Sequence, residues 1–288
     1  MSINPISPAQ CRAFLYLLLG CMGTGVSKAT APGYRPAPHF LGTEKSDQAE
    51  ARQALQELRQ AGIAGGYWLS FEVQVLPRQG EDRSLRGQLF GIHSDLGPLT
   101  RLSLAKQEWL IRSGPKPALW HRGTPGIAVR QLTTGDALEP VAGTDLTAFD
   151  LQMPFLYWDD FVYEGLAKIR GRPAYSFILY PPADLAAARP DLTGVRVALD
   201  TQFHALVQAE QLGLKGESRK TMTVLDLKKV GEQWLPKQID YRNQVTRDKT
   251  RFNLTAAALN LSWPAVDFSP EGLSGALPSL EGVRIESL

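Results

Sequence analysis

The stretch Leu69-Ser70-Phe71-Glu72-Val73-Gln74-Val75 alternates apolar and polar side chains at every position. Successive side chains of a β-strand point to opposite faces, so this period of two predicts a strand with one apolar and one polar face. The period is different just before it, where residues 46–61 are predicted to form a helix that stops at Gly62. The apolar stripe of that helix is Ala51, Ala54, Leu55 and Leu58. A sheet therefore begins where the period changes.

Short runs of the strand type recur along the chain and are separated by turn residues. They lie at residues 85–92, 99–104, 108–112, 118–122, 127–132, 161–169, 174–180, 195–199, 203–211, 218–227, 234–243 and 249–255. The 26 glycines and 20 prolines among the 288 residues supply the turns. A second helical segment is expected at residues 146–158, interrupted by Pro154. Because strands do not alternate with helices, we predict a mainly β protein with helices (α+β), built on a large curved antiparallel sheet or open barrel.

The composition is that of a folded protein with little net charge. There are 31 Lys and Arg residues against 29 Asp and Glu, which gives a net charge of +2, and 43% of the residues are hydrophobic. Such a chain can form a core, and wholesale disorder is excluded. It has no global positive field, so we do not expect a nucleic-acid partner.

The N-terminus has the pattern of an export signal. Arg12 is followed by the apolar run 13–19, which is too short to be a permanent membrane anchor. Two alternatives remain open: a signal peptide over residues 1–29, cleaved after Ala29, or a leader over residues 1–20, because Leu18-Leu19-Gly20-Cys21 resembles a bacterial lipobox in which Cys21 would be lipidated.

The remaining domain layout follows from the leader and the strand pattern. Residues 30–43 are expected to be a linker, 44–275 a single domain, and 276–288 a C-terminal tail. The two cysteines, Cys11 and Cys21, both lie in the leader region, so we expect neither a disulfide nor a cysteine-rich metal site in the exported chain.

The sequence contains no motif that predicts catalysis or a cofactor. The four histidines, at positions 39, 93, 121 and 204, have no metal-ligand spacing, and neither a phosphate-binding glycine loop nor a nucleophile elbow is present. The densest acidic group is Asp159-Asp160 with Glu164, but adjacent strand residues point apart, which favours a solvated cluster. We therefore predict no catalytic residue, no metal ligand, no cofactor and no enzymatic activity.

The apolar strand faces together exceed what two helical segments can cover. Either the sheet closes on a filled core, or it curves around a cavity with an apolar lining. A cavity of that kind suits an acyl chain, because burying each methylene is worth about 0.8 kcal/mol. Strand parity and side-chain size give the candidate lining: Phe71, Val73, Leu102, Trp109, Ile111, Trp120, Phe177, Leu179, Val197 and Leu199.

The region from Asp150 to Leu273 carries a series of strand and turn signatures. They are Tyr163-Glu164-Gly165, Gly171-Arg172-Pro173-Ala174-Tyr175, Leu179-Tyr180-Pro181, Val197-Ala198-Leu199-Asp200, the run 230–236, Thr250-Arg251-Phe252 and Asp267-Phe268-Ser269. On these features the chain resembles the outer-membrane lipoprotein-sorting proteins, the LolA/LolB-like family. The resemblance implies an unclosed β-barrel around one or two helical segments, with a hydrophobic cavity for acyl chains. The family's lid-contacting arginine could correspond to Arg59, Arg83 or Arg86.

The expectation from sequence is an exported periplasmic monomer that binds lipid acyl chains or lipidated proteins. It would act as a carrier or receptor in lipoprotein sorting, with an envelope membrane protein as a further partner. Lipidation of Cys21 would anchor it to the outer membrane, whereas cleavage after Ala29 would leave it soluble. Two alternatives stay open: an envelope sensor or scaffold that binds a protein partner, and an enzyme with a hydrophobic substrate and a site around His93, His121 or Glu164.

Overall fold

The alternating stretch lies in strand β1 (Gly66–Leu76), near the middle of a single 14-stranded antiparallel sheet. The computed structural model describes residues 45–60, 62–123 and 127–288, so the expected leader, Cys21 and the linker lie outside the described residues. β1 pairs with β2 (Arg83–Ser94) on one side and with β13 (Lys249–Leu261) on the other. The apolar set predicted from sequence, including Phe71 and Val73, is buried on one face.

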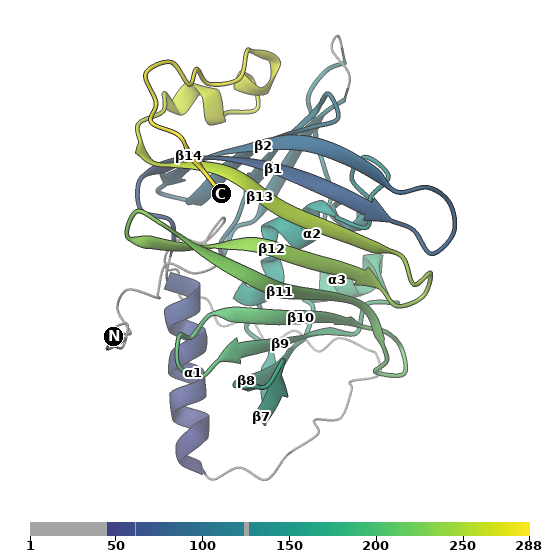
Figure 1. Ribbon diagram of the computed structural model, residues 1–288. Coiled ribbons are helices and arrows are strands. Elements are labelled where there is room, and N and C mark those ends of the chain that lie inside the picture. Colours follow the sequence, from purple (N-terminus) through teal and green to yellow (C-terminus); the bar gives the residue numbers. More distant parts are fainter. Residues whose placement is uncertain (1–44, 61, 124–126) are drawn as a thin grey trace.

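The remaining strands extend the sheet in both directions from this centre (Figure 1). On the β2 side follow β3 (Gly97–Leu104), β4 (Gln107–Arg112), β5 (Ala118–Arg122) and β6 (Arg130–Gln131). On the β13 side follow β12 (Gln233–Asn243), β11 (Ser218–Val230), β10 (Leu206–Leu212), β9 (Gly194–Asp200), β8 (Arg172–Leu179) and β7 (Phe161–Ile169). The short β14 (Glu286–Ser287) pairs with β13. The path ends at β6 and β7, which do not pair with each other in the described part of the chain, so the barrel is unclosed.

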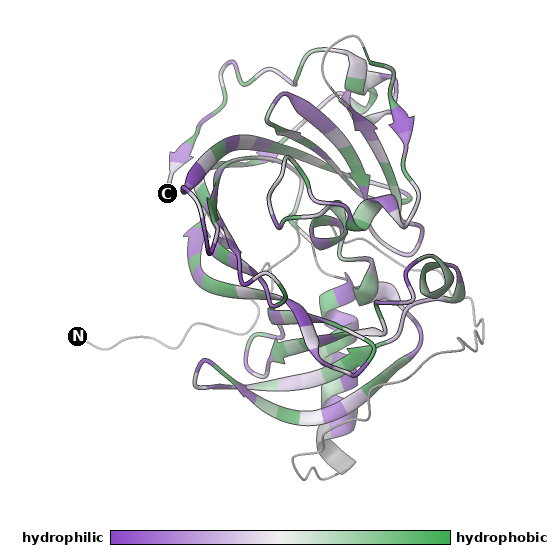
Figure 2. Ribbon diagram, turned by 90° about the vertical axis from the view of Figure 1, so that its right-hand side faces the viewer, coloured by the Kyte–Doolittle hydropathy of each residue, from purple (hydrophilic) through white to green (hydrophobic). Residues whose placement is uncertain are grey.

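Helical segments occupy the concave side of this sheet, as Figure 2 shows. α1 (Lys45–Gln60) packs against β7, and its predicted stripe from Ala51 to Leu58 is buried in the main core. The second predicted helix, 146–158, is present as two short pieces: α2 (Ala148–Gln152) and the 3-10 helix η2 (Pro154–Tyr157). They are separated at Met153, which adopts a left-handed conformation with φ of 45°. α3 (Ala183–Ala188), which the sequence did not predict, follows β8.

The convex side of β1 to β5 carries a second, smaller apolar cluster. Its centre is Trp68, Phe90 and Leu110, and the chain after β13 packs on it through the 3-10 helices η3 (Ala265–Phe268) and η4 (Gly272–Ser274). Residues of the expected C-terminal tail also join it: Leu277, Leu280 and Val283.

A fully buried arginine fixes this C-terminal segment to the sheet. Arg101 donates two hydrogen bonds to Glu108, at 2.9 and 2.6 Å, and two more to the backbone oxygens of Asp267 and Gly275. Arg122 holds the second oxygen of the Glu108 carboxylate. A buried charge is tolerated only when it is paired and hydrogen-bonded, and here both ions are.

The fold class predicted from sequence is confirmed. The protein is mainly β with few helices, and its large curved antiparallel sheet forms an unclosed barrel around helical segments. The β6 prediction, 127–132, is too long, because only Arg130–Gln131 pair.

Candidate functional site

The candidate site is the concave apolar face and the segment that fills it. Nine of the ten residues expected to line a cavity belong to the main core on this face. They are Phe71, Val73, Leu102, Trp109, Ile111, Phe177, Leu179, Val197 and Leu199. All nine are almost completely buried, so the structure gathers them on one face without leaving them open to solvent.

Trp120 is the exception, and the expectation for it was wrong. It is only partly buried and packs against the convex cluster, opposite Leu110 of β4. The concave residues of β5 are its neighbours: Leu119 lies in the main core, and His121 stacks on Trp109 at 4.9 Å. The side-chain size of Trp120 suggested an inward position, but the register places the odd-numbered residues of β5 inside.

The concave face is filled by the connection between β6 and β7, residues 132–160, which we call the insert. Phe149, Phe155 and Trp158 of the insert form an aromatic group, with ring centroids 5.6–6.3 Å apart. Together with Met153 and Leu156 they are buried against the sheet. The insert has only short helical turns, so side-chain packing on the sheet holds it in place more than its own backbone bonds do.

Small cavities lie between the insert and the sheet, and Asp150 contributes to the lining of two of them. The larger measures about 30 Å³ and is lined by residues such as Ile111, Met153, Ile239 and Phe252. The smaller measures about 10 Å³ and includes Phe155 and Met222. Spaces of this size hold a water molecule or two, whereas pockets for drug-sized ligands measure about 300–1,000 Å³. An acyl chain therefore fits on this face only where the insert has moved away.

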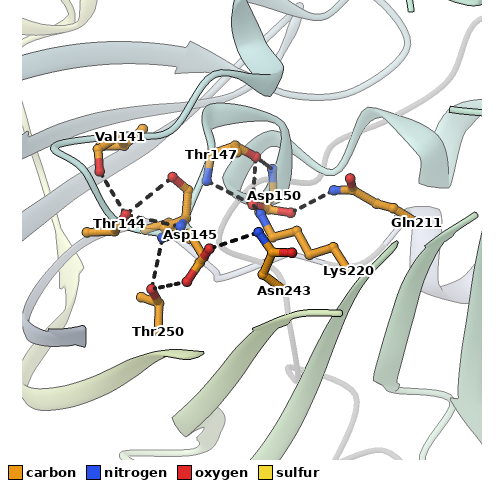
Figure 3. A network of polar contacts seen from close by, with 10 residues as sticks. Val141, Thr144, Asp145, Thr147, Asp150, Gln211, Lys220, Asn243 and Thr250 are labelled. Atoms are coloured by element: carbon orange, nitrogen blue, oxygen red, sulfur yellow. Dashed lines mark hydrogen bonds and ion pairs between the residues drawn. The ribbon is translucent and has the colours of Figure 1, made fainter. Parts of the chain in front are cut away.

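Two aspartates attach the insert to the sheet through a row of polar side chains (Figure 3). The sheet supplies Gln211 of β10, Lys220 of β11, Asn243 of β12 and Thr250 of β13, which we call the donor row. Gln211 Nε2 donates to Asp150 Oδ1 at 3.2 Å, and Lys220 Nζ forms an ion pair with Asp150 Oδ2. Asn243 Nδ2 and Thr250 Oγ1 donate to the two oxygens of Asp145, at 3.3 and 3.2 Å.

Local sequence explains why Asp150 is held in this place. Thr147 and Asp150 form a capping box at the start of α2: the Asp150 carboxylate accepts from the backbone N and Oγ1 of Thr147, at 2.8 and 2.6 Å. Asp150 is buried, and Lys220 is 12% exposed. Burial raises the pKa of the nearby Tyr241 far above its ordinary value, and the charge of Asp150 acts in the same direction.

Two of the three candidate lid arginines contact the insert. Arg59 of α1 donates from Nε to the oxygen of Leu156 and from Nη2 to the oxygen of Trp158, the latter at 2.8 Å. Burial lowers the pKa of Arg59 below its ordinary value, with opposing contributions from Asp159 and Tyr157. Arg83 of β2 donates to the backbone oxygen of Gly143, in the first half of the insert. Arg86, by contrast, is exposed on β2.

The groups considered for catalysis do not form one cluster. His93 is exposed on β2, and His121 lies on β5, whereas Glu164 lies on β7 at the far edge of the sheet. Glu164 is buried and accepts from Ser176 at 2.8 Å and from Arg196 at 2.8 and 3.2 Å. Within residues 45–60, 62–123 and 127–288, no group of three or more His, Cys, Asp or Glu side chains could hold a metal ion. The helices of that same part of the chain include none that is both long and apolar enough to cross a membrane.

Sequence reasoning missed the donor row because its residues come from four different strands. Three members of the row lie on the same strand face as apolar core residues: Gln211 with Ala209, Lys220 with Met222, and Asn243 with Tyr241. A polar residue at the end of an apolar strand face, repeated on three strands, was the signal available in the sequence. The capping pattern Thr147-x-x-Asp150 was also present in the sequence.

Comparisons with known proteins agree on the fold. A domain from Vibrio parahaemolyticus described as an outer membrane lipoprotein-sorting protein is similar over 73% of this chain and 92% of its own, with 17% identity and a TM-score of 0.65. A DUF1329 family protein from Desulfovibrio piger is similar over 78% and 98%, with 12% identity and a TM-score of 0.66. A LolA superfamily protein from Nitrosomonas europaea is similar over 77% and 96%, with 12% identity and a TM-score of 0.55.

The sequence comparisons add one family. A family model described as "Uncharacterized protein"-like matches residues 127–275. No curated protein matches the chain. The resemblance to LolA-like proteins is thus confirmed at the level of the fold.

Proposed function

We propose that this chain is an exported, non-enzymatic lipid- or lipoprotein-binding protein. The chain belongs to the family described as "Uncharacterized protein"-like and has the LolA-like fold. It acts in the periplasm as a carrier or receptor in outer-membrane lipoprotein sorting and shields acyl chains on its concave face. The observation that carries this proposal is the filling of that face by the insert rather than by the sheet itself. The side chains of Phe149, Met153 and Phe155 occupy the space that an acyl chain would take.

The physical need for such a shield supports the proposal. A diacylated protein exposes a large apolar surface, and each methylene left in water costs about 0.8 kcal/mol. A curved sheet with a continuous apolar face covers that surface without a tight fit, because acyl chains are flexible. The insert covers the same face when no ligand is bound, which keeps a large apolar patch away from water and from other proteins.

Ligand entry then requires the insert to leave the concave face. Polar contacts hold it at several points along its length. Arg59 binds carbonyls close to β7, and Arg83 binds Gly143. The donor row binds Asp145 and Asp150, and Gln152 donates to backbone oxygens of β4 and β5. The insert and the ligand compete for one face, so contacts that stabilise the insert lower the apparent affinity for the ligand.

We propose that processing of the leader determines whether the mature protein is soluble or anchored to the membrane. An unmodified mature chain that starts at Thr30 is a soluble carrier, and a chain that starts at a lipidated Cys21 is an anchored receptor. Mass spectrometry of the mature protein distinguishes the two.

The experiment that tests the proposed function is equilibrium binding of a fluorescent fatty acid and of a diacylated lipopeptide to delipidated protein. Saturable binding with one site per chain is expected, because there is one concave face. Absence of saturable binding to both ligands would refute the proposal. A membrane protein that co-purifies in the absence of any lipid would instead indicate a sensor or scaffold.

A further inference from the structure

The donor row consists of one cation and three neutral side chains, and all four donate to carboxylates of the insert. We propose that Gln211, Lys220, Asn243 and Thr250 form a headgroup site for an anionic amphiphile, and that Asp145 and Asp150 occupy this site when the insert covers the sheet. This inference rests on the proposed function and extends it by naming the ligand class: an acyl chain that carries a carboxylate or phosphate headgroup.

The four side chains lie together because of the strand register. Gln211 pairs with Lys220 across β10 and β11, and Lys220 pairs with Asn243 across β11 and β12. Thr250 is opposite Tyr241, two residues before Asn243 on β12. Directly opposed residues have Cβ atoms about 5 Å apart, so Gln211, Lys220 and Asn243 form one polar line across three strands. Thr250 is a diagonal neighbour of Asn243, at about 7–8 Å.

Every side chain of the row donates to a carboxylate of the insert. Gln211 and Lys220 donate to Asp150, and Asn243 and Thr250 donate to Asp145. Thr250 Oγ1 also accepts from the backbone N of Asp145. The row itself contains one cation and no carboxylate, so the negative charge leaves with the insert and the donors remain on the sheet.

When the insert leaves the sheet, Asp150 and Lys220 lose their ion pair and differ in the other contacts that each retains. Asp150 retains the hydrogen bonds from Thr147 N and Oγ1, because that residue moves with it. Within the described residues, Lys220 forms one ion pair, with Asp150, and its Nζ also lies 5.7 Å from the centre of the Tyr241 ring. A cation on a largely buried surface is costly without an anion. Lys220 therefore favours a ligand that supplies one.

The apolar part of the site begins next to the donor row. Two residues along the same strands lie Ala209, Met222 and Tyr241, all in the main core and all facing the insert. A headgroup bound at Lys220 would therefore direct its acyl chain along the apolar concave face. A neutral lipid would fill the same face but leave Lys220 without an anion and with the Tyr241 ring as its remaining partner, which gives the site a preference for an anionic head.

The test is calorimetric titration of the delipidated protein with dodecanoate, dodecyl phosphate and 1-dodecanol, three ligands with the same chain. We expect the two anions to bind about tenfold or more tightly than the alcohol. Lys220→Met should reduce this preference to less than about twofold. Because the variant also removes an ion pair that holds the insert, the alcohol should bind at least as tightly as to the unaltered protein. Lys228→Met is the matched control, because Lys228 is an exposed residue of the same strand, and it should retain the preference.

Two further variants test the headgroup site independently of Lys220. Asp150→Asn removes the competing charge and keeps a side-chain oxygen that can accept from Thr147 N in the capping box, so dodecanoate should bind more tightly than to the unaltered protein. Gln211→Leu removes a neutral donor and should reduce the preference for dodecanoate over dodecanol several-fold. It replaces Lys220→Met if that variant does not fold.

The outcomes separate the two claims. Equal affinity for dodecanoate and dodecanol, in the unaltered protein and in Lys220→Met, would overturn the headgroup site and leave acyl binding intact. Failure of all three ligands to bind would overturn the proposed function. Acetate or inorganic phosphate binding as tightly as the long-chain anions would show a free-anion site and would overturn the assignment to an amphiphile.

Discussion

Arg59 offers a direct way to loosen the insert without altering the concave face. Its guanidinium donates to the carbonyl oxygens of Leu156 and Trp158 and lies 5.4 Å from the ring of Phe161. Replacement by Met keeps an unbranched side chain that can pack on Phe161 and removes both hydrogen bonds. The change therefore acts on the contact between α1 and the insert.

The magnitude follows from those two bonds. A hydrogen bond from a charged donor contributes about 1.5–3 kcal/mol, and because Arg59 is partly exposed we expect about 2–3 kcal/mol for both together. If ligand and insert compete for the concave face, this loss raises the apparent affinity for a fatty acid by about 30- to 150-fold, since about 1.4 kcal/mol is a factor of ten.

The assay is a fluorescent fatty-acid titration of Arg59→Met beside urea unfolding of the same sample, in which the free energy of unfolding should fall by a similar amount. Arg52→Met is the control: Arg52 lies on the same helix, is exposed, and stacks on Phe161 at 5.8 Å. Its affinity should change less than threefold. A destabilised Arg59→Met protein with unaltered fatty-acid affinity would refute competition between insert and ligand.

Three other predictions concern stability. Arg101→Met should lower the free energy of unfolding by about 3 kcal/mol in urea titrations, because it leaves the buried Glu108 with one cation fewer; a loss below about 1 kcal/mol would contradict this. Removal of residues 276–288 should expose the convex cluster and lower the urea midpoint, and an unchanged midpoint would show that Leu277, Leu280 and Val283 add nothing. Burial lowers the pKa of His121 below its ordinary value of 6.5, and the charge of Arg130 acts in the same direction. The unfolded chain therefore binds the proton at a higher pH than the folded chain, so the free energy of unfolding should decrease as the pH falls below about 6.5. His121→Gln should flatten that part of the pH profile, and an unaltered profile would assign it to other groups.

The sequence predicted the strands well because their signal is local. Alternation over a few residues gave β7 (Phe161–Ile169) with both ends correct, and β5 (Ala118–Arg122) likewise. The same parity placed nine lining residues on the inner face. It failed for Trp120 because β5 is short and both of its faces carry large side chains, so size and parity gave different answers.

What the sequence could not show depends on contacts between distant segments. Asp150 meets Lys220 and Gln211 across 70 and 61 residues, and Arg59 meets Trp158 across 99. No local pattern marks such pairs. The filled state of the cavity is another example: apolar residues of the insert, such as Phe149 and Phe155, predict burial but not the surface on which they are buried.

The central claim is that acyl chains bind on the concave face in the place of the insert. The most direct measurement is photocrosslinking with a fatty acid that carries a diazirine in its chain, followed by mapping of the labelled peptides. We predict labelling of inward-facing residues such as Ile111, Ile239 and Phe252, and its suppression by excess unlabelled fatty acid. Labelling confined to the convex cluster around Trp68 and Phe90, or labelling that excess fatty acid does not suppress, would contradict the account.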